Sequence, residues 1–122
     1  MAGAGYNVVI HEFAHKLDML SGEANGIPAL PPEISRADWQ RVLHASYEDF
    51  CGQVDEAEAG GQETLFDPYA AENPGEFFAV ISEAFFESPG LLRAQYPTLY
   101  EQFAAFYRQD PAARRLPASD LQ

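Results

Sequence analysis

The most informative segment of the chain reads Val8-Val9-Ile10-His11-Glu12-Phe13-Ala14-His15-Lys16-Leu17-Asp18-Met19. Two histidines four residues apart lie one turn from each other on one face of a helix, so both imidazoles can bind a single ion. The glutamate between them lies beside that face, where it can accept a proton from a water bound to the ion. The pattern predicts that His11 and His15 are zinc ligands and that Glu12 is a general base. The alternative is a pair of surface histidines on a helix.

The residues around this motif predict which sides of the helix are buried. His11, His15 and Asp18 fall on one side, which we expect to face a cleft. Asp18 can orient an imidazole by accepting its second N–H, or it can be a solvated residue late in the helix; the sequence favours neither. We expect Ser21-Gly22 to end the helix. Apolar residues recur at helical spacing on the neighbouring side and are expected to pack: Ile10, Phe13, Ala14, Leu17 and Leu20.

A zinc peptidase site needs a third protein ligand and leaves the fourth position to water. The extended motif with a further histidine six residues after the second is absent, because position 21 is serine. The remaining histidine, His44, belongs to a separate amphipathic segment and is expected at the surface. A carboxylate is therefore the expected third ligand, which predicts a His-His-Glu site of the gluzincin kind.

The segment from Asn73 to Ser88 is the best source of that carboxylate. Asn73 can cap a helix that Pro74 begins, and Ser88-Pro89-Gly90 is expected to stop it. Apolar residues surround this helix almost completely, which predicts burial: Phe77, Phe78, Val80, Ile81, Phe85 and Phe86. Yet three glutamates follow one narrow stripe of it: Glu76, Glu83 and Glu87. Buried carboxylates are costly unless they are paired or bind a metal. Spacing alone leaves both Glu76 and Glu83 as candidate ligands, and Glu76 can also be a first-turn acid favoured by the helix N-terminus.

Two further segments of the chain are informative: Asp67-Pro68-Tyr69-Ala70-Ala71 and Pro74-Gly75-Glu76-Phe77-Phe78-Ala79-Val80. Together with the histidine motif they resemble the Mlc titration factor A family, which are bacterial zinc peptidases whose catalytic domain is similar to that of anthrax lethal factor. The resemblance implies a zincin-like, gluzincin-type fold with one Zn²⁺ per chain. It implies that His11, His15 and Glu76 bind the zinc, that Glu12 is catalytic and that Tyr69 stabilises the transition state. Glu83 is then expected to accept a histidine N–H.

The same resemblance implies a function and a domain organisation. It implies aminopeptidase-type hydrolysis of a peptide substrate and, in enteric members, binding to the glucose-responsive transcriptional repressor Mlc. Family members carry a substantial region before the zinc helix, whereas ten residues precede His11 here. We therefore expect residues 1–122 to form a single metallopeptidase catalytic domain that lacks most of the upstream region. The alternative is a protein-interaction module that retains a non-catalytic zinc site.

The charge, the cysteine content and the lack of long apolar runs bear on the partners and the cellular compartment of the protein. The net charge is −12 and Lys16 is the sole lysine, which excludes binding to a phosphate backbone and hence to nucleic acid. The lone Cys51 forms no internal disulfide, which fits a reducing cytoplasm. No signal peptide and no apolar run of membrane-spanning length is present, so we expect a cytoplasmic protein without a membrane partner.

The rest of the chain predicts further helices and gives a mainly α fold class. Ser35 and Asp38 can form a capping box for a long helix. Its acidic end is expected to lead through Gly60-Gly61 into a flexible loop up to Tyr69. Pro97 is expected to start another helix. The inward residues of the long helix are expected to be Trp39, Val42, Leu43, Phe50 and Val54, and the last helix carries an aromatic stripe that we interpret as core: Tyr96, Tyr100, Phe103 and Tyr107.

Overall fold

A computed structural model describes residues 8–20 and 22–113 of the chain. Within these ranges the structure contains helices and no strand, which confirms the mainly α prediction. None of these helices combines the length and the apolar character needed to cross a membrane. The elements in chain order are α1 (Val8–Met19), α2 (Arg36–Gly60), the 3-10 helix η1 (Pro68–Ala71), α3 (Pro74–Glu87), α4 (Pro89–Gln95) and α5 (Pro97–Tyr107).

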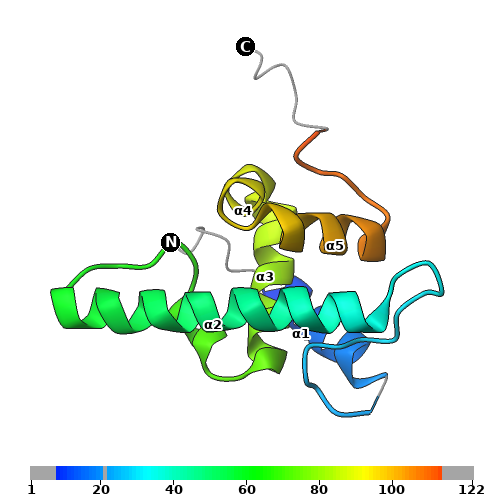
Figure 1. Cartoon of the computed structure of the whole chain (residues 1–122), viewed down its shortest axis with the longest axis horizontal. Coiled ribbons are helices and arrows are strands. Elements are labelled where there is room, and N and C mark those ends of the chain that lie inside the picture. The colour runs from blue at the N-terminus through cyan, green and yellow to red at the C-terminus, as the bar shows by residue number, and fades with distance from the viewer. Residues whose placement is uncertain (1–7, 21, 114–122) are drawn as a thin grey trace.

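Helix α3 is the centre of the fold. Figure 1 shows α2 running across the front of the molecule, α3 crossing behind it, and α4 and α5 together on one side. Of the described elements, α3 alone contacts all the others, whereas α1 contacts only α3. The prediction of a buried helix is confirmed, because the nine consecutive residues from Phe77 to Phe85 are buried. Gly75 is also buried, and Glu76 between them is half-buried. Phe86 is the exception, since its side chain is partly exposed.

Aromatic side chains fill the space between α2, α3 and α5. Trp39 of α2 lies parallel to Phe103 of α5, with ring centroids 5.3 Å apart, and Phe78 of α3 packs against both rings. The inward residues predicted for α2 are all buried. Tyr96, Tyr100 and Phe103 are also buried, which confirms that this stripe belongs to the core. Tyr107, the last member of the stripe, is half-buried.

Local capping signals set the helix ends. The Ser35 side chain accepts a hydrogen bond from the backbone N–H of Asp38 at the start of α2, as predicted. At the other end of α2, Gly61 adopts a left-handed conformation with a φ of 70°, which an L side chain rarely adopts. Asn73 accepts from the N–H of Glu76 and so begins α3 at Pro74.

Of two sequence predictions on the connections, one was confirmed and one was wrong in part. Ser88 ends α3 as expected, but Pro89 begins the short helix α4, because a proline is well suited to the first position of a helix. The segment before Tyr69 was expected to be a flexible loop. Residues 61–67 do form a loop, but the side chain of Phe66 is buried against Phe50 and Tyr96, and η1 begins at Pro68.

The prediction for the faces of α1 was also wrong. Phe13 is 57% exposed and Leu20 is 75% exposed, whereas His11 and Asp18 are buried. Ala14 is the member of the apolar stripe that packs as expected. The polar side can be buried because its side chains have hydrogen-bond partners on α3 and in the following loop. Helix α1 ends at Met19, and Ser21 lies outside the described residues.

Candidate metal centre

The two motif histidines of α1 point towards α3. Their ring centroids are 4.9 Å apart and the rings meet edge to face. His11 is buried and His15 is half-buried. The helical spacing therefore brings both imidazoles to the same place, as the sequence predicts.

Glu76 lies at the start of α3 and faces both imidazoles. Its Oε1 atom is 3.0 Å from Nε2 of His11 and 3.1 Å from Nε2 of His15. Asn73 and Pro74 fix the first turn of α3, and this turn is where Glu76 sits. One carboxylate oxygen and two imidazole nitrogens of these three residues lie within 4.8 Å of one another. Among the described residues, this is the group of metal-binding side chains that the structure brings together.

Glu83 lies two turns further along α3 and contacts the other nitrogen of the same imidazole. Its Oε2 atom is hydrogen-bonded to Nδ1 of His11, and the glutamate is only 1% exposed. Burial lowers the pKa of His11, but the hydrogen bonds and negative charges of Glu83 and Glu76 outweigh this effect and raise it above its usual value. The two carboxylates that spacing could not tell apart thus contact different atoms of His11.

Glu12 and Tyr69, which the sequence predicts to be catalytic, are both exposed. Glu12 is exposed on α1, on the open side of the helix. Tyr69, from η1, is 50% exposed, and its ring centroid lies 6.5 Å from that of His11. The negative charge of Glu76 raises the pKa of the Tyr69 hydroxyl. A tyrosine hydroxyl is protonated at neutral pH even without this shift, so it is available as a hydrogen-bond donor.

Asp18 has a role that the sequence analysis missed. It is fully buried, so it is not a solvated residue. Its carboxylate accepts the backbone N–H of Gly26 at 2.7 Å and that of Asn25 at 3.3 Å. Burial raises the pKa of Asp18, and these hydrogen bonds partly offset the rise. Asp18 thus holds the loop after α1. The signal in the sequence was an acid at a helix end before a glycine-containing loop, whose N–H groups need acceptors.

His44 is remote from the cluster, as predicted. It lies on the exposed side of α2 and pairs with Glu48 one turn later, with 3.1 Å between Nε2 and Oε2. It does not join the ligand group formed by the described residues.

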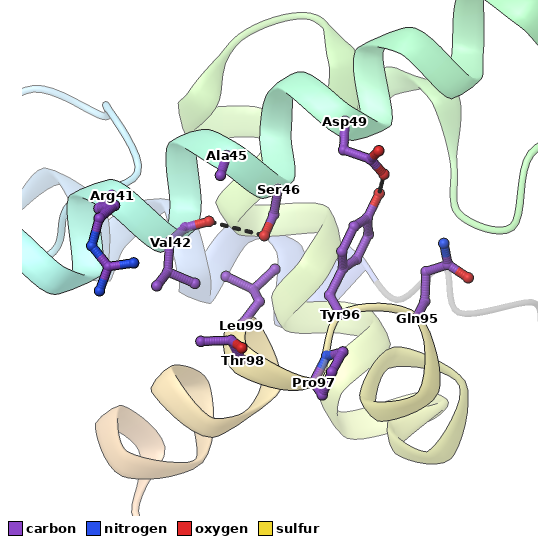
Figure 2. Close-up of a pocket in the computed structure, with 10 residues that line it drawn as sticks. All are labelled: Arg41, Val42, Ala45, Ser46, Asp49, Gln95, Tyr96, Pro97, Thr98 and Leu99. Carbon is purple, nitrogen blue, oxygen red and sulfur yellow. Dashed lines mark hydrogen bonds between the residues drawn. The ribbon is translucent and has the colours of Figure 1, made fainter.

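A hollow of about 570 Å³ lies elsewhere, between α2 and the junction of α4 and α5. Figure 2 shows Tyr96 reaching across it to Asp49, with a hydroxyl-to-carboxylate distance of 2.8 Å. That carboxylate is therefore already engaged, and no histidine lines the hollow. Its chemistry does not match that of the cluster. The residues around it are Arg41, Val42, Ala45, Ser46, Asp49, Gln95, Tyr96, Pro97, Thr98 and Leu99.

The cluster defines the class of protein. Two histidines one helical turn apart and a carboxylate from a second helix match the ligand set of a metallopeptidase, whose divalent metal is typically zinc, and a glutamate lies between the two histidines in the sequence. The comparison with known proteins agrees and is more specific. Residues 1–108 match the family described as glucose-regulated metallo-peptidase M90. The chain belongs to this family.

Curated relatives extend this result. The chain is 46% identical over 112 residues to Mlc titration factor A of Serratia proteamaculans, an alignment that covers 91% of this chain and 42% of the relative. It is 50% identical over 114 residues to the protein of the same name in Edwardsiella ictaluri, with the same coverage. For the Yersinia pestis protein of that name the identity is 45% over 112 residues, covering 91% and 40%. The chain therefore spans about two fifths of the length of these relatives.

Proposed function

We propose that residues 1–122 form one zinc-dependent peptide-hydrolysing domain, in which His11, His15 and Glu76 hold a single zinc ion. The observation that carries the proposal is the position of the Glu76 carboxylate. One of its oxygens lies 3.0 and 3.1 Å from the Nε2 atoms of the two histidines. Sequence similarity to the family supports the same assignment.

The dimensions of the cluster fit zinc. Zinc bonds of about 2.0–2.2 Å to nitrogen and oxygen place neighbouring tetrahedral ligands about 3.3 Å apart. The two contacts of Glu76 are close to this separation, and the whole set lies within 4.8 Å. A zinc ion in this place would polarise a peptide carbonyl and lower the pKa of a bound water.

Two residues outside the ligand set, Glu12 and Tyr69, would then assist hydrolysis in different ways. Glu12 accepts the proton of the attacking water and delivers it to the departing amine nitrogen. Its exposure on the open side of α1 suits this role, because a general base must reach both water and substrate. Tyr69 donates a hydrogen bond to the oxyanion that develops on the carbonyl. The position of Tyr69 supports this role, since its ring centroid lies 6.5 Å from that of His11.

The substrate and partner proposals concern the whole protein. We propose a peptide substrate and aminopeptidase-like cleavage, which rest on the family resemblance. The name of these relatives, Mlc titration factor A, supports a second role in binding a transcriptional repressor of sugar uptake. A cytoplasmic site of action suits both roles, and the free Cys51 is compatible with a reducing compartment.

Replacing the proposed base tests the function. Glu12→Gln keeps the shape of the side chain but cannot accept a proton. We expect it to retain one equivalent of zinc by native mass spectrometry and to lose at least about 100-fold in turnover of amino-acid anilides. The matched control is Glu101→Gln on α5, an exposed glutamate remote from the cluster, which should behave like the wild type. Equal turnover by wild type and Glu12→Gln would refute the general-base assignment.

A non-catalytic interaction module is the second candidate function. The observation in its favour is the exposed apolar surface of α1, which includes Val9, Phe13 and Leu20. A wild-type chain that binds one equivalent of zinc but cleaves neither anilides nor peptides would favour this module over the enzyme. A zinc-supplemented chain with well under half an equivalent of metal would refute both candidates.

A further inference from the structure

Glu83 is a buried acid whose position calls for an explanation. It lies in the most buried helix of the fold and is only 1% exposed. Removing a carboxylate from water costs several kcal/mol unless a partner compensates for the lost hydration. A neutral amide or an apolar residue would fill the same space at lower cost. The contact of Glu83 Oε2 with Nδ1 of His11 supplies the compensation.

This contact determines which nitrogen of His11 is available to a metal. A carboxylate only accepts hydrogen bonds, so Nδ1 must carry the hydrogen atom. In the neutral imidazole the lone pair then resides on Nε2. Nε2 is the atom that lies 3.0 Å from Glu76 Oε1, inside the ligand group. The two glutamates are seven residues apart on one face of α3, so a single helix contacts both nitrogens of one imidazole.

We propose that Glu83 is a positioning residue for His11: it fixes the tautomer and the orientation of the ring so that Nε2 is presented to the metal. The inference rests on the proposed zinc site and assigns a role to a residue outside the ligand set. A carboxylate in this position also makes the imidazole a stronger ligand. Loss of such a partner typically lowers metal affinity about 10- to 100-fold.

The alternative is that Glu83 only forms a structural ion pair between α1 and α3 and does not position His11. In that case the charge of Glu83 would stabilise the folded chain but would leave the affinity of the folded site for zinc unchanged. The substitution that separates the two roles is Glu83→Gln, which keeps the volume and removes the charge. The matched control is Glu87→Gln, one turn further along α3, where the side chain is exposed.

The experiment has two readouts. The first is the zinc dissociation constant of the folded chain, measured at neutral pH by competition with a chromophoric chelator. We expect it to rise at least about 10-fold in Glu83→Gln and to change less than about twofold in Glu87→Gln. The second is the tautomer of His11 in the metal-free wild type, read from imidazole ¹⁵N shifts at a pH where the ring is neutral. We expect the hydrogen on Nδ1.

The outcomes distinguish the two proposals. A wild type that binds zinc, with Glu83→Gln binding it as tightly as Glu87→Gln does, overturns the positioning role and leaves the zinc site intact. A wild type that binds no zinc refutes the proposed function, and the positioning role falls with it. A hydrogen on Nε2 of His11 in the wild type overturns the positioning role even if Glu83→Gln fails to fold.

Discussion

Gly75 offers a direct test of how the fold positions the metal centre. It immediately precedes Glu76 in the first turn of α3. A Cβ at this residue would lie 2.5 Å from the carbonyl oxygen of Ala24 and 3.3 Å from Oδ1 of Asn73. Ordinary contacts of a Cβ begin at about 3.4 Å, so Gly75→Ala must move the helix start or the facing loop by about 0.9 Å.

The loop is poorly placed to yield. The backbone N–H groups of Asn25 and Gly26, next to Ala24, are held by the buried carboxylate of Asp18. The carbonyl of Gly26 in turn accepts the indole N–H of Trp39 at 2.7 Å. We therefore expect the first turn of α3 to shift, and the Glu76 carboxylate to shift with it.

The magnitude follows from two opposing effects. Overpacking costs about 1–3 kcal/mol, whereas replacing a helical glycine by alanine contributes about 0.5–1 kcal/mol of stability. Because the close contact is with a backbone oxygen, we take the upper part of the overpacking range, about 2–3 kcal/mol. The net expectation for Gly75→Ala is then a loss of about 1–2.5 kcal/mol in the free energy of unfolding, together with zinc binding that is about 10-fold weaker. Urea unfolding followed by circular dichroism and a zinc competition titration measure the two quantities.

Gly52 provides the matched control. It lies in the interior of α2, is exposed, and has nothing within 4 Å of an added Cβ. Gly52→Ala should therefore raise stability by about 0.5–1 kcal/mol and leave zinc binding unchanged. If Gly75→Ala is as stable as the wild type, the close approach of loop and helix does not constrain the fold. If it is destabilised but binds zinc normally, the first turn does not position Glu76.

Two further predictions concern the core. Burial raises the pKa of Tyr107 to about 12, although its hydrogen bond with Ser82 partly offsets the rise. Between pH 9 and 11 the unfolded chain releases this proton while the folded chain keeps it, so stability falls by about 1.3 kcal/mol as pH rises. Tyr107→Phe should reduce the loss of stability over this range by that amount. If the free energy of unfolding falls with pH equally in wild type and variant, the raised pKa is not that of Tyr107. Trp39→Phe should lower the free energy of unfolding, measured in urea, by about 2–4 kcal/mol, because it opens a cavity beside Phe103 and leaves the carbonyl of Gly26 without its donor. A loss below about 1 kcal/mol would show that the indole hydrogen bond is not needed.

Features that depend on neighbouring residues could be predicted from the sequence. Ser35 and Asn73 cap their helices through backbone N–H groups three residues later, and the structure confirms both. The spacing of His11 and His15 likewise sets their proximity, because four residues make about one helical turn. In each case the residues that carry the sequence pattern and the residues that they contact lie within about one turn of the same helix.

Features that depend on distant contacts could not be predicted in this way. The apolar stripe of α1 was expected to pack, but the partners of its two histidines are carboxylates more than sixty residues away. Burial of these imidazoles is favourable because α3 supplies the carboxylates, and no local pattern records that. The choice between Glu76 and Glu83 has the same origin. The two residues share one stripe of α3, and only the position of α1 decides which nitrogen each one meets.

The packing of α1 against α3, the only helix among the described elements that it contacts closely, has a thermodynamic consequence. An ion held by His11, His15 and Glu76 is a cross-link between these two helices, and it can form only when they are docked. Zinc binding then stabilises the docked arrangement of the two helices relative to the undocked one. The stabilisation is about 2.7 kcal/mol when the free zinc concentration is 100 times the dissociation constant. The zinc supply would therefore set the fraction of molecules in which the motif helix is in place. If the proposed zinc site is correct, such a domain would assemble its reactive centre in response to the availability of the metal.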